Sequence, residues 1–431
     1  MNLKEMAIQS RKAFYDLSVS SVEQRNQFLR QLADRLYLDR DQIFTANQMD
    51  VKEAEQDGLA LPLLHRLAFG TEKLLQVREG LFSLSQLPDP LNRTVFCHEI
   101  TEGLKLYRVT CPIGVLGIIF ESRPDALIQI ASLAVKSGNA ALLKGGREAL
   151  RTNRALISSV HSALLSAGLP ENSAQLMETR EDVADMLKED ELIDLIIPRG
   201  SNSFVRYIMD NSRIPVLGHA DGICHVYVDR YADLELASRV ALDSKIQNLA
   251  VCNAMETLLV HQDIADSFLP SFCKLLQENH VEIRGDESVQ SVFPCVPATE
   301  EDWRTEYLDA ILSIRIVPSL QAAIDHINYY GSHHTDCIIT KNDSSAREFL
   351  SRVDSAGVYQ NVSTRFADGF VYGFGAEVGI STGKIHSRGP MGLDGLTTYK
   401  YKLIGHGQTM KEMKTGQRHY THLVLTESCP F

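Results

Sequence analysis

The sequence of 431 residues lacks a hydrophobic run long enough to cross a membrane. Its longest apolar stretch, residues 112–120, falls far short of the roughly 18 to 20 residues that a spanning helix needs. Residues 1–16 carry Lys, Arg, Asp and Glu around no apolar centre, unlike a signal peptide or a transit peptide. We therefore expect a cytoplasmic protein with no membrane partner.

The sequence also lacks an excess of positive charge. Its 43 Lys and Arg stand against 55 Asp and Glu, which gives a formal net charge of −12. A surface with this balance repels phosphate backbones, so we expect no nucleic-acid partner. Apolar residues at 44% and charged residues at 23% are ordinary for a globular enzyme and exclude a disordered or fibrous chain.

Cysteine and histidine are present without the spacing of a disulfide framework or a metal site. The eight Cys are scattered with no CxxC pair, so we predict reduced thiols, most of them buried packing residues. The pairs His333-His334 and His419/His422 lack the Cys or carboxylate neighbours of a zinc site, and we predict no metal. No Gly-x-Ser-x-Gly elbow is present, which argues against a serine hydrolase.

Strand-like and helix-like segments alternate along most of the chain. Residues 1–90 have helical apolar spacing, and residues 94–110 read as two strands around a Glu-Gly turn. Four strands alternate with three helices over 115–197, and a second alternation follows over 224–340. We predict an α/β fold of two doubly wound domains with a small β element, and a tail from 405 that folds back or pairs at a subunit edge.

A dinucleotide fingerprint is missing between strand and helix. The nearest pattern, residues 373–379, has the wrong spacing, so we predict a turn beside a site. Two other junctions, 143–147 and 197–201, place Gly and a basic residue where a strand runs into a helix, the position at which pyrophosphate and ribose groups bind. Lys144 and Arg147 would favour a 2′-phosphate, although two ordinary loops with solvated cations would have the same pattern.

One thiol stands out among the eight. Cys252 follows small and apolar residues, and the next four residues could form a turn of helix before a strand. A thiol at a helix N-terminus has a lowered pKa and nearby backbone N–H groups that can receive an oxyanion. Buried packing is the alternative role for any single cysteine.

Two polar segments could bind an anion. Arg123 follows the first strand of the predicted parallel sheet and could clamp an anionic group, or pair with Asp125 to order its loop. Residues 361–366 offer hydroxyl, amide and guanidinium groups that suit a carboxylate pocket, or simply form a capped turn.

Taken together, nine segments of the sequence resemble the γ-glutamyl phosphate reductase family, the glutamate-5-semialdehyde dehydrogenases of proline biosynthesis within the aldehyde dehydrogenase superfamily. The segments are 115–124, 137–139, 143–148, 196–201, 218–227, 250–257, 361–366, 375–382 and 386–395. The resemblance covers about residues 1–404, in order. The chain departs from it at Leu249, where the family usually has Pro, at Val251, where Ala is common, and in the tail.

The resemblance implies a reaction. The thiolate of Cys252 would attack the acyl phosphate of L-glutamate 5-phosphate, and the resulting thioester would accept a hydride from NADPH to give L-glutamate 5-semialdehyde. Superfamily members that hydrolyse the thioester place a Glu base where this chain has residues 217–220, which contain no acid. This absence fits the biosynthetic direction, in which water must not reach the acyl enzyme. His219 would handle a proton or hold a structural position.

The resemblance also implies roles for other residues. Cofactor contacts would come from Lys144 at the adenosine ribose, Gly200 and Ser201 at the pyrophosphate, and Glu306 at the nicotinamide ribose. Substrate contacts to the phosphate and the α-carboxylate would come from Arg123, Asn361, Ser363 and Arg365.

The implied organisation has an NADPH-binding domain, residues 1–91 and 111–221, and a catalytic domain, residues 222–390. An oligomerisation element would comprise 92–110 and 391–404, followed by a tail, 405–431. A homo-oligomer and a functional coupling to glutamate 5-kinase are expected. Two alternatives stay open: an acylating aldehyde dehydrogenase that uses acyl-CoA, and a non-catalytic binding or scaffold protein on the same fold.

Overall fold

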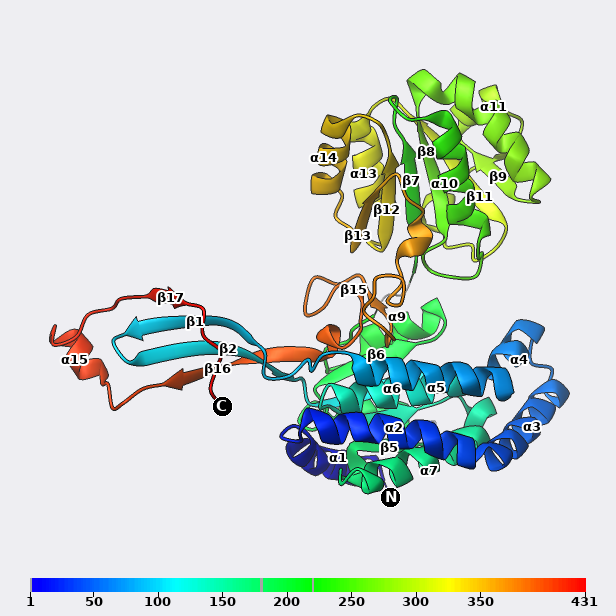
Figure 1. The fold of residues 1–431 in the computed structure, drawn as a ribbon. Coiled ribbons are helices and arrows are strands. Elements are labelled where there is room, and N and C mark those ends of the chain that lie inside the picture. Colours follow the sequence, from blue (N-terminus) through cyan, green and yellow to red (C-terminus); the bar gives the residue numbers. More distant parts are fainter. Residues whose placement is uncertain (1, 179–180, 219–220) are drawn as a thin grey trace.

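The computed structural model describes residues 2–178, 181–218 and 221–431 (Figure 1). Two α/β units lie one above the other, and a long β arm extends sideways from the lower unit. The α/β architecture expected from the sequence is therefore present. None of the described helices is long and apolar enough to cross a membrane.

Five helices form the N-terminal part of the lower unit. They are α1 (Leu3–Leu17), α2 (Val22–Leu38), α3 (Arg40–Gln56), α4 (Leu61–Leu67) and α5 (Thr71–Gln86). Helix α2 starts with a capping box in which the Ser21 side chain accepts from the Gln24 backbone N–H. Its apolar residues Phe28, Leu29, Leu32 and Leu36 are fully buried, so the helical spacing read in the sequence is the face that packs.

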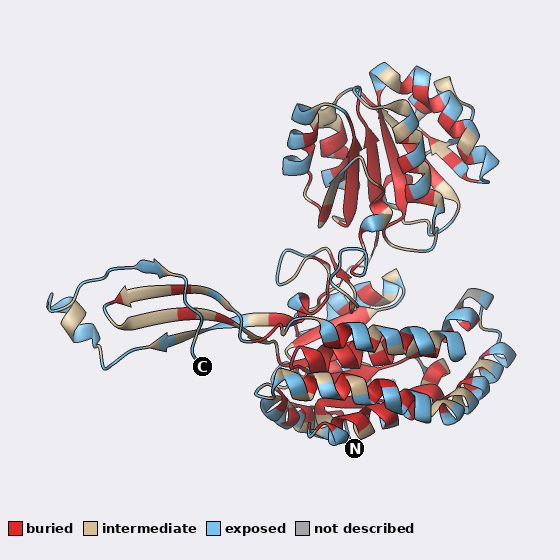
Figure 2. Ribbon diagram, in the orientation of Figure 1, coloured by how far each residue is buried: buried red, intermediate tan, exposed pale blue. Residues whose placement is uncertain are grey.

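The lower sheet is parallel, with strand order β5-β4-β3-β6. Its elements are β3 (Val115–Phe120), α6 (Pro124–Lys136), β4 (Ala140–Lys144), α7 (Leu150–Ser166), β5 (Ala174–Met177), α8 (Glu181–Met186), β6 (Leu195–Arg199) and α9 (Asn202–Asn211). Every residue of β3 and β4 is buried, as Figure 2 shows for the centre of this unit. These continuous apolar runs are typical of parallel strands that helices cover on both faces.

The upper sheet is also parallel, with strand order β10-β9-β11-β8-β7-β12-β13. Its elements are β7 (Cys224–Val228), α10 (Leu234–Ile246), β8 (Met255–His261), α11 (Gln262–Glu278), β9 (Glu282–Gly285), α12 (Glu287–Val292), β10 (Val296–Pro297), β11 (Ile311–Val317), α13 (Leu320–Tyr330), β12 (Thr335–Ile339), α14 (Asp343–Arg352) and β13 (Gly357–Gln360). The chain enters β7 from the lower unit, so the amino ends of β7 and its parallel neighbours face downward (Figure 1).

The arm is an antiparallel sheet with strand order β16-β2-β1-β17. Its strands are β1 (Thr94–Thr101), β2 (Leu104–Pro112), β16 (Thr397–Ile404) and β17 (Leu423–Leu425), with α15 (Met410–Lys414) between the last two; a short pair, β14 (Ile380–Ser381) and β15 (Gly389–Pro390), precedes β16. The tail folds back, as expected, and Leu425 pairs opposite Cys97 of β1. The tail thus adds a strand to the β element rather than lying apart from it.

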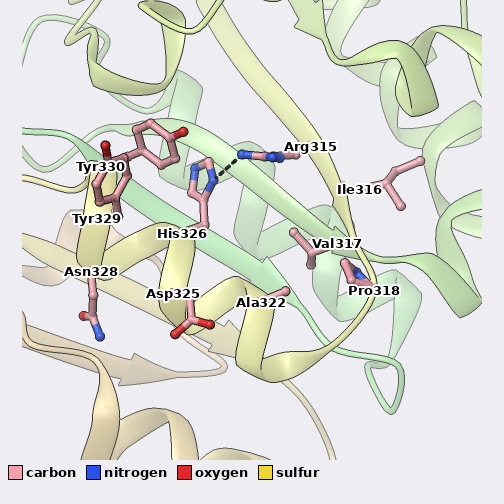
Figure 3. A pocket seen from close by; sticks show the side chains of 10 residues that line it. All are labelled: Arg315, Ile316, Val317, Pro318, Ala322, Asp325, His326, Asn328, Tyr329 and Tyr330. Atoms are coloured by element: carbon pink, nitrogen blue, oxygen red, sulfur yellow. Dashed lines mark hydrogen bonds between the residues drawn. The ribbon is translucent and has the colours of Figure 1, made fainter.

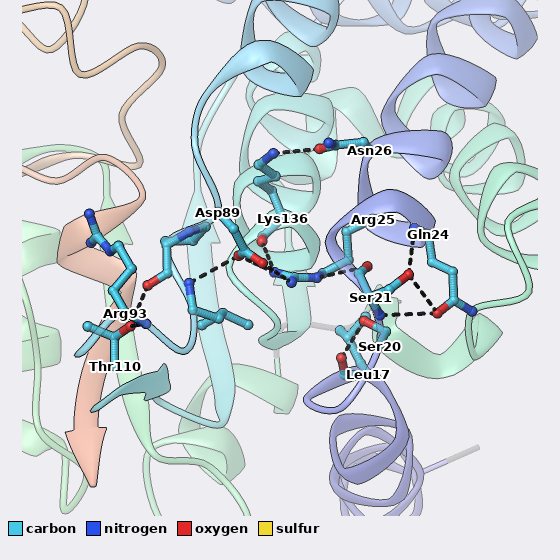
Figure 4. Close-up of polar contacts among 12 residues, drawn as sticks. Leu17, Ser20, Ser21, Gln24, Arg25, Asn26, Asp89, Arg93, Thr110 and Lys136 are labelled. Atoms are coloured by element: carbon cyan, nitrogen blue, oxygen red, sulfur yellow. Dashed lines mark hydrogen bonds and ion pairs between the residues drawn. The ribbon is translucent and has the colours of Figure 1, made fainter. Parts of the chain in front are cut away.

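A buried polar cluster fixes the root of the arm (Figure 4). The guanidinium of Arg25 is 1% exposed and donates to both carboxylate oxygens of Asp89, at 3.1 and 2.8 Å, and to the Lys136 carbonyl at 2.7 Å. The Lys136 ammonium donates to the Leu87 carbonyl at 3.0 Å. Burial lowers the pKa of Lys136. Helices α2 and α6 are thereby tied to the segment that leads into β1.

All eight cysteines are free thiols. Only half of them are buried, namely Cys97, Cys224, Cys273 and Cys337. The prediction that most of the cysteines are buried packing residues is therefore wrong. The other four are only partly buried, because they lie in loops, at strand ends and in the tail.

Candidate active site

Cys252 lies in the loop between α10 and β8, at the amino end of the strand. A turn closed by the Ala254 N–H and the Val251 carbonyl, at 3.0 Å, leads directly into β8. The predicted helix turn at this position is wrong, because only two residues separate the sulfur from the strand. A Cβ at Gly222 would lie 2.2 Å from the Cys252 carbonyl oxygen, so this neighbouring position accepts only glycine.

Three neighbouring strands bring their amino ends to the sulfur. The Sγ of Cys252 lies 3.2 Å from Nε2 of His334, a fully buried residue immediately before β12. Cys224, the first residue of β7, donates from its thiol to the Cys252 carbonyl at 3.3 Å. Strands β8, β7 and β12 are adjacent in the sheet, so the parallel pairing itself assembles this group. Cys252 is half-buried.

The electrostatic environment keeps the Cys252 thiol protonated at neutral pH. Burial raises its pKa to about 12; the carboxylates of Glu306 and Glu377 raise it further, and Arg199 opposes them. The sequence-based expectation of a lowered pKa is wrong, because it relied on a helix N-terminus that is not there. A base or a new positive charge must therefore act when this sulfur reacts.

Three arginines act electrostatically around this site. Arg199 is the last residue of β6. Burial and the nearby charge of Arg123 lower the pKa of Arg199, and the Cys252 sulfur opposes this shift. Burial also lowers the pKa of Arg365, which the same sulfur opposes. Arg365 donates from Nε to the Gln247 side chain at 2.9 Å. Arg199 belongs to the segment 197–201, which the sequence analysis singled out. Its electrostatic effect on Cys252 was not predicted, because that effect depends on how the two sheets face each other.

Asn361 and Ser363 lie in the predicted polar segment, but the fold uses their polar atoms. The Asn361 amide accepts from the Thr340 N–H and donates to the Thr340 carbonyl, both at 2.9 Å, which ties the ends of β12 and β13 together. The Ser363 hydroxyl accepts from Ser244 at 3.2 Å. These contacts hold Asn361 and Ser363 in place, and their contact with the substrate stays a prediction.

The same segment holds the loop that contains Cys252. The Thr364 hydroxyl donates to the Asn253 carbonyl at 2.7 Å, and the Asn253 side chain donates to the Ala367 carbonyl at 3.0 Å. These bonds fix the residue that follows Cys252. No local pattern predicts these bonds, because more than a hundred positions separate the partners.

The N-terminus of α9 holds an anionic side chain. The Ser201 N–H donates to Oε2 of Glu121 at 3.1 Å, and a Cβ at Gly200 would lie 2.6 Å from the same oxygen. Glu121 directly follows β3, so the carboxyl ends of β3 and β6 form this anion position together. Lys144 ends β4 at the same edge, is buried, and donates to the Gly145 carbonyl at 2.7 Å.

Glu306 connects this edge to the sulfur. Its Oε2 accepts from the Asn202 side chain at the start of α9, at 2.6 Å, and its charge acts on Cys252. Burial raises the pKa of Glu306. Glu306 therefore contacts the start of α9 and acts electrostatically on Cys252.

Glu377 belongs to the segment 373–379, which was expected to be a turn beside a site. Residues 370–373 form turns, and Oε2 of Glu377 accepts from the Gly369 N–H at 2.9 Å. Burial raises the pKa of Glu377 to about 7; Asp368 adds to this shift and Arg199 opposes it. His219 lies outside the described residues. Within the described ranges no group of three or more His, Cys, Asp and Glu could hold a metal ion.

A hollow of about 690 Å³ lies elsewhere, along β11 and α13 (Figure 3). Nη1 of Arg315 lies 3.0 Å from Nδ1 of His326 on its wall. Burial lowers the pKa of His326 to about 2, so this ring is neutral. None of the site residues named above lines this hollow.

Two parallel α/β units with a cysteine where their strand ends face each other define the aldehyde dehydrogenase class, and the sequence model of the aldehyde dehydrogenase family matches residues 1–292. A γ-glutamyl phosphate reductase of Acetivibrio thermocellus is 54% identical over 430 residues, which is 100% of both chains. One of Pelotomaculum thermopropionicum is 54% identical over 422 residues, 98% of this chain and 97% of that one.

Solved structures agree with these relatives. The crystal structure of γ-glutamyl phosphate reductase from Thermotoga maritima is 40% identical, covers 95% of this chain and 100% of that chain, and superposes with a TM-score of 0.93. An engineered glycolyl-CoA reductase with bound NADP⁺, at 15% identity and a TM-score of 0.64, covers 94% and 97% of the two chains and shows the fold alone. The chain belongs to the γ-glutamyl phosphate reductases of the aldehyde dehydrogenase family and is an oxidoreductase that acts on an aldehyde.

Proposed function

We propose that the protein reduces L-glutamate 5-phosphate to L-glutamate 5-semialdehyde and phosphate, with NADPH as the reductant and a thioester on Cys252 as the intermediate. The observation that carries the proposal is the position of Cys252, which lies where the carboxyl edge of the lower sheet meets the amino edge of the upper sheet. Full-length identity of 54% to a relative named for this reaction supports the choice of substrate.

The charges around Cys252 suit this substrate. L-Glutamate 5-phosphate carries a phosphate and an α-carboxylate, and guanidinium groups bind both kinds of anion in bidentate geometry. Arg199 and Arg365 act electrostatically on the sulfur, and Arg123 acts on Arg199. In a chain with a net charge of −12, this group of cations would concentrate an anionic substrate at the reactive sulfur.

The lower unit fits a dinucleotide cofactor. The carboxylate of Glu121 stands at the α9 N-terminus as an internal anion, and Gly200 leaves no Cβ to fill that cradle. Gly200 and the Ser201 N–H would hold the pyrophosphate, Lys144 the adenosine ribose, and Glu306 the nicotinamide ribose. When bound, the reduced nicotinamide supplies the hydride.

The chain's own residues carry out the acyl transfer. The sulfur of Cys252 forms a bond to the γ-acyl carbon, the bond from that carbon to the phosphate oxygen breaks, and phosphate leaves with the electron pair. The main-chain N–H of Cys252 would stabilise the oxyanion of the tetrahedral intermediate. A thioester suits the second step, because its carbon is electrophilic and the sulfur leaves readily once hydride has been added.

The test uses the reverse reaction, in which NADP⁺ oxidises glutamate semialdehyde and phosphate accepts the acyl group from the thioester. We expect Cys252→Ala to abolish this reaction while NADPH binding stays near that of the wild type. Cys295→Ala is the matched control, since Cys295 is a half-buried thiol of the same unit. Retention of phosphate-dependent turnover by Cys252→Ala would overturn the proposal.

Replacing phosphate with coenzyme A in the same assay distinguishes the proposed reaction from that of an acylating aldehyde dehydrogenase. An acylating dehydrogenase on the same fold would release the acyl group to CoA. We expect turnover with phosphate and none with CoA. The opposite result would keep the cysteine chemistry and reject the acyl phosphate as substrate.

We also propose that the arm joins copies of the chain into a homo-oligomer. Strand β16 is an edge strand, and its residues Tyr399, Tyr401 and Leu403 are exposed. An open edge with exposed aromatic side chains favours pairing with another chain. Sedimentation velocity measures the resulting state.

A further inference from the structure

The ring of His334 is held by both of its nitrogens. Nε2 lies 3.2 Å from Sγ of Cys252. Nδ1 lies 3.0 Å from Oγ1 of Thr335 and 3.7 Å from Sγ of Cys224, whose thiol donates to the Cys252 carbonyl. The residue is fully buried in the connection between α13 and β12. A neutral imidazole has one N–H and one lone pair, so the partner of one nitrogen decides what the other offers.

The Thr335 hydroxyl sets the useful arrangement. If Nδ1–H donates to Oγ1 of Thr335, the lone pair of Nε2 points at the sulfur and can accept the S–H proton. The neighbouring carboxylates are engaged elsewhere: Glu377 accepts from the Gly369 N–H, and Glu306 accepts from the Asn202 side chain. Among the described residues, the imidazole is therefore the base with direct hydrogen-bonding geometry to the Cys252 sulfur.

We propose that His334 accepts the proton of the Cys252 thiol as the sulfur attacks the substrate and returns it when the thioester collapses, with Thr335 as the positioning residue. This inference rests on the proposed function for the identity of the acyl donor. The S–H bond breaks toward Nε2, and the new S–C bond displaces phosphate, which takes one proton from solvent. Hydride then adds to the acyl carbon, the C–S electron pair returns to sulfur, and His334 gives back the proton.

Several other charged or titratable groups face this pair and enter its pH dependence. Glu306 approaches from the loop before β11, Glu377 from a segment that packs on the core of the lower unit, and Arg199 from the end of β6. Arg365 and Cys224 approach from the segment after β13 and from β7. Burial and the two carboxylates keep the proton on sulfur at rest. A base that acts during the attack therefore fits this site better than a resting thiolate.

The test compares His334→Asn with His333→Asn. The neighbouring His333 is a matched control, because its Nδ1 lies 2.5 Å from the Asp354 carbonyl rather than at the sulfur. The first readout is the rate at which iodoacetamide alkylates Cys252, measured from pH 6 to pH 11 and located by peptide mass. We expect His334→Asn to be slower than His333→Asn by at least about tenfold near pH 7.5 and equal to it as the solution approaches the pKa of the thiol.

The second readout is phosphate-dependent turnover. Loss of a general base lowers kcat by about 10²- to 10⁴-fold, and we expect added imidazole to restore part of it in His334→Asn. Thr335→Val leaves the imidazole in place and tests its orientation, with an expected fall in kcat and little change in KM. If His334→Asn fails to fold, Thr335→Val and His334→Gln give the same comparison.

The outcomes separate this inference from the proposed function. Alkylation and turnover of His334→Asn equal to those of His333→Asn would overturn the role of His334 and leave the substrate untouched. Slow alkylation at neutral pH that recovers at high pH supports the proton transfer even if phosphate fails to support turnover, in which case only the substrate assignment falls.

Discussion

A buried ion pair should determine the stability of the upper unit. The Lys245 Nζ lies 2.6 Å from Oε2 of Glu256, and both side chains are 0% exposed. Lys245 is in the last turn of α10 and Glu256 is the second residue of β8, so the pair joins the two ends of the nucleophile loop. Removing one partner of a buried pair costs about 3–5 kcal/mol, because the other is left without compensation.

The cost of Lys245→Met should depend on pH in a defined direction. Burial raises the Glu256 pKa to about 7, and Lys245 opposes this shift. In an unfolded chain the same carboxyl has a pKa of about 4.3. Between about pH 4 and pH 7 the folded state therefore holds the Glu256 proton that the unfolded state has lost, and the free energy of unfolding falls as the pH rises. In Lys245→Met the pKa of Glu256 in the folded protein rises above 7. The free energy of unfolding therefore continues to fall above pH 7, by about 1.4 kcal/mol per pH unit.

The assay uses the single tryptophan of the chain. Trp303 is buried in the upper unit, so its fluorescence in urea reports the unfolding of that unit. Arg230→Met is the matched control, because the Arg230–Asp263 pair has the same kind of contact, at 2.5 Å, but its side chains are 49% and 41% exposed. We expect the control to cost less than about 1 kcal/mol at every pH. Equal costs for the two variants, or a cost of Lys245→Met that is the same at pH 6 and pH 8.5, would refute the reasoning.

Two further variants test the geometry and charge around the sulfur. Gly222→Ala should lower kcat by about 100-fold, because its Cβ would meet the Cys252 backbone at 2.2 to 2.5 Å. Gly218→Ala, whose Cβ would lie 3.6 Å from Pro198, should stay near wild type. A loss of kcat with unchanged Trp fluorescence indicates a misplaced Cys252 rather than an unfolded protein. Glu377→Gln should speed alkylation of Cys252 by about 2- to 10-fold above pH 7 and leave it unchanged below pH 6. The reason is that the Glu377 carboxyl has a pKa of about 7 and is already neutral in acid. An equal effect at pH 6 and pH 8 would contradict this reasoning.

Much of the fold could be predicted from the sequence, since its signals are local. The spacing of Phe28, Leu29, Leu32 and Leu36 predicted a helix face that is fully buried. The apolar run 115–120 predicted a strand, and all six residues of β3 are buried. Each signal lies within one element, so periodicity alone is enough.

The site was harder to predict, because its partners are far apart in the sequence. His334 lies 82 positions after Cys252, and it was considered only as a metal ligand. Arg199 is brought to the sulfur by the facing of two sheets, which no local pattern encodes. The helix expected at Cys252 failed for a local reason, since the chain turns into β8 after two residues.

The direction of the strands explains why the sulfur and the cofactor groups need different partners. At the carboxyl edge of the lower sheet, helices begin, and their N-termini favour anions such as the Glu121 carboxylate. At the amino edge of the upper sheet, helices end, as α10 does before Cys252 and α13 does before His334, and helix C-termini disfavour a thiolate.

Positive charge at Cys252 must therefore come from other parts of the molecule. Arg199, at the end of β6 in the lower sheet, and Arg365, in the segment after β13, provide it. Under the proposed function the two units contribute different groups: the upper edge holds the sulfur and an imidazole, and the lower edge holds Arg199 and the proposed cofactor contacts. A single α/β unit would lack one of these two sets.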